Sequence, residues 1–165
     1  MSSRLADGAV GSVLSALLRC PEVMKLRYDA ASGSLVYSLA VEGDVSAQCE
    51  RVLSKRVRGA LDALFALDRL SPSVVEFRQE RLGKVSRLHM ERDVATMSPE
   101  EVYLTVDLVS ELMGERLVME SGGTDEDGVE EDMLGSMLEA LHEGKALGSR
   151  LMACRESGRV LLFHK

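Results

Sequence analysis

The fold of this chain is decided by residues 24–42, which read MKLRYDAASGSLVYSLAVE. Apolar and polar side chains alternate before and after the segment 31–34, and Gly33 supplies the freedom that a tight turn needs. A period of two puts the apolar side chains on one face of a strand and the polar ones on the other. The stretch therefore predicts a two-stranded hairpin with one dry face and one wet face. The dry face comprises Met24, Leu26, Tyr28, Ala30, Leu35, Tyr37, Leu39 and Val41, and the wet face of the first strand comprises Lys25, Arg27 and Asp29.

The same unit recurs along the chain, because helical patterns alternate with hairpin patterns that turn on a glycine. The predicted hairpins are 24–42, 73–92 and 150–165. The predicted helices are 4–19, 45–67, 99–113 and 129–143. This order predicts a single α+β domain over residues 1–165, with an antiparallel sheet built from hairpins and with helices packed mainly on one face.

Local signals mark several boundaries. Ser98 precedes Pro99 and can cap a helix, and Glu101 can reach back to complete a capping box. Asp44 is the expected cap of the helix that begins at residue 45. The hairpin at 73–92 has the weakest alternation. The strand at 160–163 is apolar on both faces, so we expect it at the centre of the sheet, or beneath a helix and a partner.

Composition places the chain among cytoplasmic globular proteins. It has 165 residues, a net charge of −7, 45% hydrophobic and 28% charged residues, values typical of a folded domain. No apolar run approaches the ~18 residues of a membrane span, and the N-terminal apolar segment has the spacing of an amphipathic helix rather than of a signal peptide. The three cysteines are widely spaced, which favours reduced thiols over a disulfide framework or a zinc site.

Charge is unevenly distributed. Residues 51–92 hold 10 basic and 5 acidic side chains, whereas residues 93–165 hold 6 basic and 16 acidic ones. This contrast suggests internal complementarity or head-to-tail contact between copies. A nucleic-acid interface would use a basic helix stripe and cations of the second hairpin, but an aromatic content of 4% and the absence of Trp leave no stacking platform. A solvated helix face is the favoured interpretation, and no nucleic-acid partner is expected. The residues concerned are Arg51, Lys55, Arg56, Arg58, Arg81, Lys84 and Arg87.

No motif for catalysis, metal or cofactor stands out. The acidic segment 121–132 fails as a calcium loop, because with Gly128 as the sixth residue of the loop the first and twelfth positions would be Gly123 and Leu134. Three histidines, His89, His142 and His164, lie too far apart in sequence for a metal pair. We therefore expect no cofactor and no metal, and an enzyme is not the favoured class.

The strongest interaction signal is the helix at 99–113. Its apolar side chains span an arc of ~200°, wider than the ~100° stripe of an ordinary surface helix. Such a helix lies deep in the core or packs on its own sheet and on a second subunit. The helix at 129–143 adds methionines, which recur at adaptable binding surfaces. The proposed partner-binding residues are Leu104, Leu108, Leu112, Met133, Met137 and Leu141.

The leading hypothesis is therefore a non-enzymatic, cytoplasmic homodimer that binds another polypeptide as an adaptor or chaperone. The order of helices and hairpins is similar to that of small acidic secretion chaperones and related dimeric adaptors, a likeness of element order that no residue motif carries. The alternative is a small-molecule-sensing or catalytic domain with a pocket between sheet and helices. Its candidate polar groups are Tyr28, Tyr37, Arg87 and His89.

Overall fold

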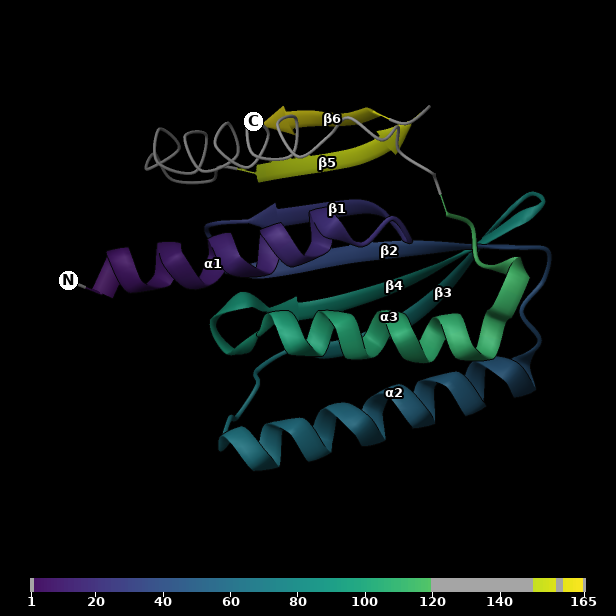
Figure 1. Cartoon of the computed structure of the whole chain (residues 1–165), viewed down its shortest axis with the longest axis horizontal. Helices are drawn as coiled ribbons and strands as arrows, with labels where there is room; N and C mark the ends of the chain where they lie inside the picture. Colours follow the sequence, from purple (N-terminus) through teal and green to yellow (C-terminus); the bar gives the residue numbers. More distant parts are fainter. Residues whose placement is uncertain (1, 120–149, 157–158, 165) are drawn as a thin grey trace.

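The computed structural model of the chain describes residues 2–119, 150–156 and 159–164. Helices and hairpins alternate in this part of the chain, as the sequence predicts (Figure 1). The helices are α1 (Ser2–Arg19), α2 (Ala47–Asp68) and α3 (Pro99–Met113), with short 3₁₀ turns η1 (Val94–Thr96) and η2 (Gly114–Arg116). The strands are β1 (Val23–Asp29), β2 (Ser34–Glu42), β3 (Val75–Leu82), β4 (Val85–Asp93), β5 (Arg150–Glu156) and β6 (Arg159–His164). The predicted helix at 129–143 lies outside the described residues.

The six strands form one antiparallel sheet in the order β3-β4-β2-β1-β5-β6. Each hairpin contributes two neighbouring strands, and the hairpins are joined by β2 against β4 and by β1 against β5. The segment 73–92 is a true hairpin, with Phe77 opposite Met90. Gly33 and Gly83 adopt positive φ in their turns, the conformation in which glycine has no steric cost. The α+β architecture predicted from the sequence is confirmed.

The core lies between one face of the sheet and the three described helices. In Figure 1, α1 and α3 lie in front of the sheet and α2 lies alongside α3. Most side chains of the dry face predicted for the first hairpin are buried there together with apolar side chains of each helix, since burial of apolar surface drives folding. Ala30 lies beyond the end of β1 and is exposed, and Met24 is half-buried. Burial raises the pKa of the Tyr37 phenol. The sheet contributes Leu26, Tyr28, Leu35, Tyr37, Leu39, Leu88 and Met90, and the helices contribute Leu14, Leu17, Leu53, Leu61, Val102, Val106 and Val109.

Two local expectations need correction. Ser98 does cap α3, accepting from the Glu101 amide at 3.3 Å, but the Glu101 side chain does not close a capping box. Its carboxylate turns inward and binds Arg92. Helix α2 is capped by Ser46 rather than by Asp44. Asp44 instead forms an ion pair with Arg81 at 2.8 Å.

The C-terminal strand is not central. β6 is the last strand in the sheet order, and no other described strand pairs with its outer side. The exposed fraction of Leu161 is 37%. The apolar residues on both faces of β6 therefore do not reflect a central position in the sheet. The other alternative, that a helix and a partner cover this strand, stays a prediction.

Candidate functional site

The face of the sheet that the three described helices leave open carries the polar side chains of the strands. A hollow of about 450 Å³ opens on this face. It is built by β1 to β4, because side chains at alternate positions of four neighbouring strands converge on it. Its lining comprises Lys25, Arg27, Val36, Ser38, Arg78, Gln79, Glu80, Arg87 and His89.

One cross-strand row forms the centre of the hollow. Arg78 pairs with His89, His89 with Ser38, and Ser38 with Lys25. Directly opposed residues of antiparallel strands hold their Cβ atoms about 4.5–5.5 Å apart on the same face. Register therefore gathers side chains that are more than fifty residues apart in sequence. Arg27 and Arg87 stand in the adjoining rows.

The lining is strongly cationic. It holds one lysine and three arginines against the single carboxylate of Glu80. Among the residues that the structure describes, no ion pair involves Lys25, Arg27, Arg78 or Arg87. We call these four residues the cation cluster. In a chain with a net charge of −7, the cluster forms a local positive field in which Glu80 is the single carboxylate of the lining.

A hydrogen-bonded chain runs through the floor of the hollow. The Ser38 hydroxyl lies 2.6 Å from His89 Nδ1, and His89 Nε2 lies 3.0 Å from Glu80 Oε2. The carboxylate can only accept, so Nε2 carries a proton and a neutral imidazole accepts the Ser38 proton at Nδ1. Ser38 is 3% exposed. The chain fixes the orientation of the His89 ring from both sides.

This serine–histidine–glutamate chain does not have the arrangement of an acyl-transfer site. Ser38 lies within β2, between β1 and β4, so the backbone amides around it take part in the ladders on both sides. Acyl transfer needs free donors directed at the developing oxyanion. The backbone amides next to the nearly buried Ser38 hydroxyl are engaged in the ladders, so they cannot serve as such donors. These hydrogen bonds between Ser38, His89 and Glu80 are better suited to position polar groups for a ligand than to activate a nucleophile.

A second hollow of about 500 Å³ continues along the same face. It shares Arg27 and Val36 with the first hollow. Its charges are balanced, with two arginines and two carboxylates, and two serines add hydroxyl groups. Its lining comprises Arg27, Asp29, Ser32, Ser34, Val36, Val74, Glu91 and Arg150.

The partner-binding residues predicted on the helix at 99–113 lie at the border of the core. Leu104, Leu108 and Leu112 are half-buried, and Leu108 and Leu112 pack against the core cluster. Helix α3 contacts both α1 and α2 and lies on the sheet (Figure 1), so the wide apolar arc has neighbours within the chain and does not require a second subunit. Met133, Met137 and Leu141 lie outside the described residues.

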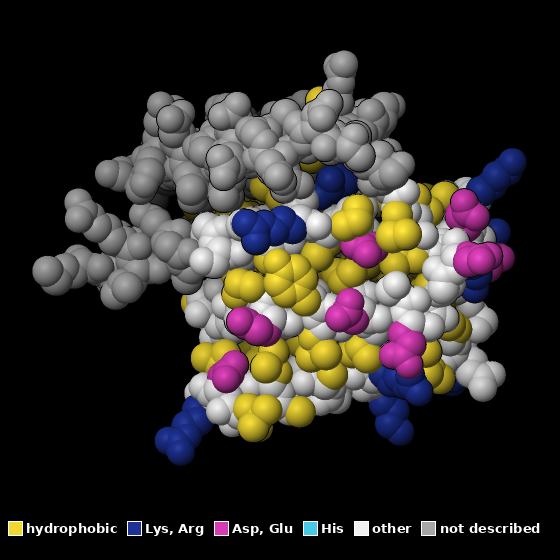
Figure 2. Space-filling view, in the orientation of Figure 1, with side chains coloured by type: hydrophobic (Ala, Val, Ile, Leu, Met, Phe, Trp, Pro, Cys, Tyr) yellow, Lys and Arg dark blue, Asp and Glu magenta, His cyan; other side chains and the backbone are white. Residues whose placement is uncertain are grey.

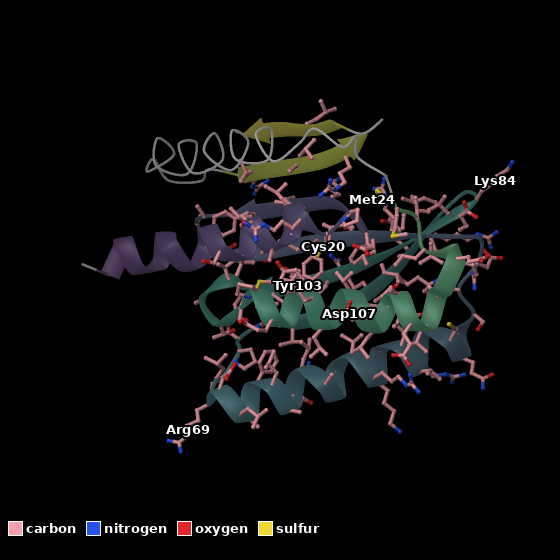
Figure 3. The ribbon with its side chains drawn as sticks, viewed as in Figure 1. Cys20, Met24, Arg69, Lys84, Tyr103 and Asp107 are labelled. Carbon is pink, nitrogen blue, oxygen red and sulfur yellow. The ribbon has the colours of Figure 1, made fainter. Side chains whose placement is uncertain are left out.

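The exposed surface of the helices carries both charged and hydrophobic side chains. Figure 2 shows acidic side chains among hydrophobic ones on this face, and Tyr103 and Asp107 lie on the exposed side of α3 (Figure 3). Exposed apolar residues that are separated by charges are normal on protein surfaces. This face therefore offers a weaker site than the open face of the sheet.

The four polar residues predicted for a pocket are not brought together. Tyr28 and Tyr37 are buried on the core face, whereas Arg87 and His89 line the hollow on the open face. Side chains on opposite faces of a sheet are separated by the backbone layer itself. The hollow that Arg87 and His89 line therefore lies on the open face of the sheet rather than between the sheet and the helices.

The basic residues considered for nucleic acid do not form one surface. Arg58 pairs with Asp62 at 3.0 Å, and Arg56 lies 3.9 Å from Glu111. Arg56 and Arg58 belong to α2, on the helix side of the sheet, whereas Arg87 faces the opposite side. Within the described ranges, no group of three or more metal-ligating side chains occurs either, and no helix is long and apolar enough to cross a membrane.

The sequence placed Lys25 and Arg27 on one polar strand face but predicted no cationic site there. The wet face of the first hairpin includes Lys25 and Arg27, and two cations at alternate positions on a strand are a usable signal. Arg78 was missed because its strand alternates weakly. Its place beside His89 depends on pairing of β3 with β4, and that of Ser38 depends on pairing of β2 with β4.

Comparison with protein-family models, with characterised proteins and with solved structures finds no match.

Proposed function

We propose that this chain is a non-enzymatic ligand-binding module that holds a small anionic molecule on the open face of its sheet. The observation that carries the proposal is the cation cluster, four basic side chains around one hollow with no ion-pair partner among the described residues. This is the sensing alternative considered from the sequence, with its site on the other face of the sheet.

Electrostatics supports an anionic ligand. Two like charges ~6 Å apart repel by about 0.7 kcal/mol in water and by more where the solvent is partly excluded. Four unpaired cations in one hollow therefore lower the stability of the unliganded protein. A bound anion removes this repulsion and gains charge-assisted hydrogen bonds, to which arginine contributes with a planar donor fork.

The dimensions and chemistry of the hollow indicate a small ligand. Small-molecule sites range from about 300 to 1,000 Å³, and the hollow measures about 450 Å³. Its lining contains no side chain of Phe, Tyr or Trp. Phosphate or carboxylate groups suit this lining better than an aromatic ring system.

Paired variants test the proposal. Arg78→Gln/Arg87→Gln removes two charges from the cluster, and Arg51→Gln/Lys55→Gln removes two exposed charges from α2 on the other side of the sheet. Binding of pyrophosphate and citrate is measured by calorimetry for each. We expect at least tenfold weaker binding for the first variant, because each charged hydrogen bond contributes about 1.5–3 kcal/mol, and less than a twofold change for the second. Equal weakening by both variants, or no binding to the wild type, overturns the proposal.

The second candidate is the homodimeric protein-binding module predicted from the sequence. The observation in its favour is the edge strand β6, whose residues 160–163 are all apolar. An apolar edge presents unpaired backbone groups for another strand, whereas the opposite edge strand β3 carries four charged residues among eight. Leu161→Lys is expected to convert a dimer to a monomer in light scattering, and a monomeric wild type at all concentrations rules this candidate out.

A further inference from the structure

The two hollows on the open face form one trough with two chemically different halves. Arg27 and Val36 line both hollows and face each other in the register of β1 and β2. One half holds the cation cluster and the chain from Ser38 through His89 to Glu80. The other half extends to Arg150 on β5 and to Ser32 in the first turn. A ligand that fills the trough therefore meets positive charge at one end and balanced charge at the other.

The balanced half is rich in acceptors for hydroxyl groups. Asp29 Oδ1 accepts from the Ala31 amide at 3.0 Å, and Asp29 Oδ2 lies 3.8 Å from Arg150 Nε. Glu91 Oε1 accepts from the Ser34 hydroxyl at 3.0 Å. A carboxylate offers about four lone-pair positions, so each retains acceptor capacity that these contacts do not use.

This half disfavours a second anion. A phosphate or carboxylate beside Asp29 and Glu91 would face two like charges in a partly buried trough, which is destabilising. Neutral hydroxyl groups can instead donate to the two carboxylates and accept from Arg150 and Ser32. Apart from aliphatic stems, the apolar side chains in this half are Val36 and Val74, so no ring is available on which a nucleobase could stack.

We infer that the ligand of this site is the monophosphate ester of a small polyhydroxylated compound, such as a sugar or polyol phosphate. Its phosphate lies in the cation cluster, and its hydroxyl groups are held by Asp29 and Glu91. This inference rests on the proposed function, since it specifies the ligand of the same site. It adds a second set of residues, and this set can be tested separately from the cluster.

The test compares four probes by calorimetry on the full chain. Inorganic phosphate reports the cation cluster alone, whereas glycerol 3-phosphate, ribose 5-phosphate and glucose 6-phosphate report both halves. We expect at least one of the three esters to bind ten times or more tightly than inorganic phosphate. If inorganic phosphate binds and no ester exceeds its affinity threefold, the inference is overturned while the proposed function stands. If none of the four probes binds, the inference is overturned, and the binding of pyrophosphate and citrate decides whether the proposed function stands.

A variant assigns the gain in affinity to its residues. Asp29→Asn/Glu91→Gln keeps the shape of both side chains and removes their charges. It should bring the ester to the affinity of inorganic phosphate and should not weaken phosphate itself. The matched control is Asp107→Asn/Glu111→Gln, two exposed carboxylates on α3. A loss of ester affinity in the control, or an unchanged ester affinity in the first variant with a native melting curve, overturns the inference.

Discussion

Arg92 and Glu101 form a two-pronged ion pair inside the protein. Nε and Nη2 of Arg92 each donate to a different Glu101 oxygen at 2.8 Å, and the two residues are 0% and 1% exposed. The guanidinium also lies 4.7 Å from the ring centroid of Phe65. Burial opposes the charge of Arg92, but the hydrogen bonds and charges of Glu101 and Asp93 outweigh it and raise the Arg92 pKa. This pair joins β4, α3 and α2.

Removal of the Glu101 charge should therefore be costly. We expect Glu101→Gln to lower the free energy of unfolding by about 1.5–3 kcal/mol, because it removes the charge from two hydrogen bonds of the buried Arg92 and leaves Asp93 as its remaining counter-charge. Urea denaturation measures the change. The neighbouring Glu100→Gln alters an exposed carboxylate in the same turn and should change stability by less than ~1 kcal/mol. Equal effects of the two variants would contradict the structural role of the pair.

Asp93 makes stability depend on pH in the acid range. Burial alone would raise its pKa, but hydrogen bonds from the Thr96 hydroxyl at 2.7 Å and the Val74 amide at 3.1 Å contribute to a net lowering below the ordinary value of 3.8. The unfolded chain therefore takes up the proton first. The contribution of Asp93 is present above about pH 4 and is lost as pH falls toward the folded pKa.

The corresponding measurement is urea denaturation of the wild type and of Asp93→Asn between pH 7 and pH 3. The difference in unfolding free energy between the two proteins should shrink as pH falls. Asp68→Asn changes an exposed carboxylate of α2 and should keep a constant difference from the wild type. A difference for Asp93→Asn that stays constant over this range would show that its pKa is not lowered by folding.

Cys20 should be the least reactive of the three cysteines. Burial, with a smaller contribution from Glu22, raises the pKa of its thiol to about 11, whereas Cys49 and Cys154 are half-buried. Alkylation requires the thiolate and access to it. Mass spectrometry after iodoacetamide treatment at pH 8 should show Cys49 and Cys154 modified first. Modification of Cys20 at the same rate as the other two would contradict its burial between α1 and the sheet.

Arg155 fastens the C-terminal hairpin to the end of α1. Its Nε donates to the Val23 carbonyl at 2.9 Å, and its Nη2 donates to the carbonyls of Leu18 and Cys20. A cation at a helix C-terminus satisfies carbonyls that have no partner in the helix. Arg155→Met should cost about 1–3 kcal/mol and speed hydrogen exchange in 150–156.

Arg150 provides the matched comparison on the same strand. It is largely exposed, and its Nε lies 3.8 Å from Asp29, a geometry worth less than ~1 kcal/mol. Arg150→Met should leave hydrogen exchange in β5 close to that of the wild type. If hydrogen exchange in residues 150–156 is equally fast in Arg155→Met and in Arg150→Met, the hairpin is held by strand pairing alone.

Glu80 gives a prediction of opposite sign to that for the arginines. It is the single carboxylate in the lining of the first hollow, so Glu80→Gln makes the hollow more positive. At ~6 Å in water the change amounts to about 0.7 kcal/mol, which corresponds to a roughly threefold tighter binding of pyrophosphate. Calorimetry measures the affinity, with Glu76→Gln, at an exposed position of the same strand, as the comparison. Weaker binding by Glu80→Gln would mean that its bond to His89 matters more than its charge.

The sequence by itself determined the local structure. Alternation in residues 24–42 predicts strands because only a period of two gives each strand one apolar face, and Ser98 marks the start of α3 because its hydroxyl satisfies a free amide. The tertiary structure decided which strands are neighbours. The row of Lys25, Ser38, Arg78 and His89 is completed only by the pairing of β2 with β4, which joins two separate hairpins, and no local pattern encodes that register. The tertiary structure also decided that Glu101 binds the buried Arg92 instead of closing a local capping box. The edge position of β6 likewise depends on how distant segments pack.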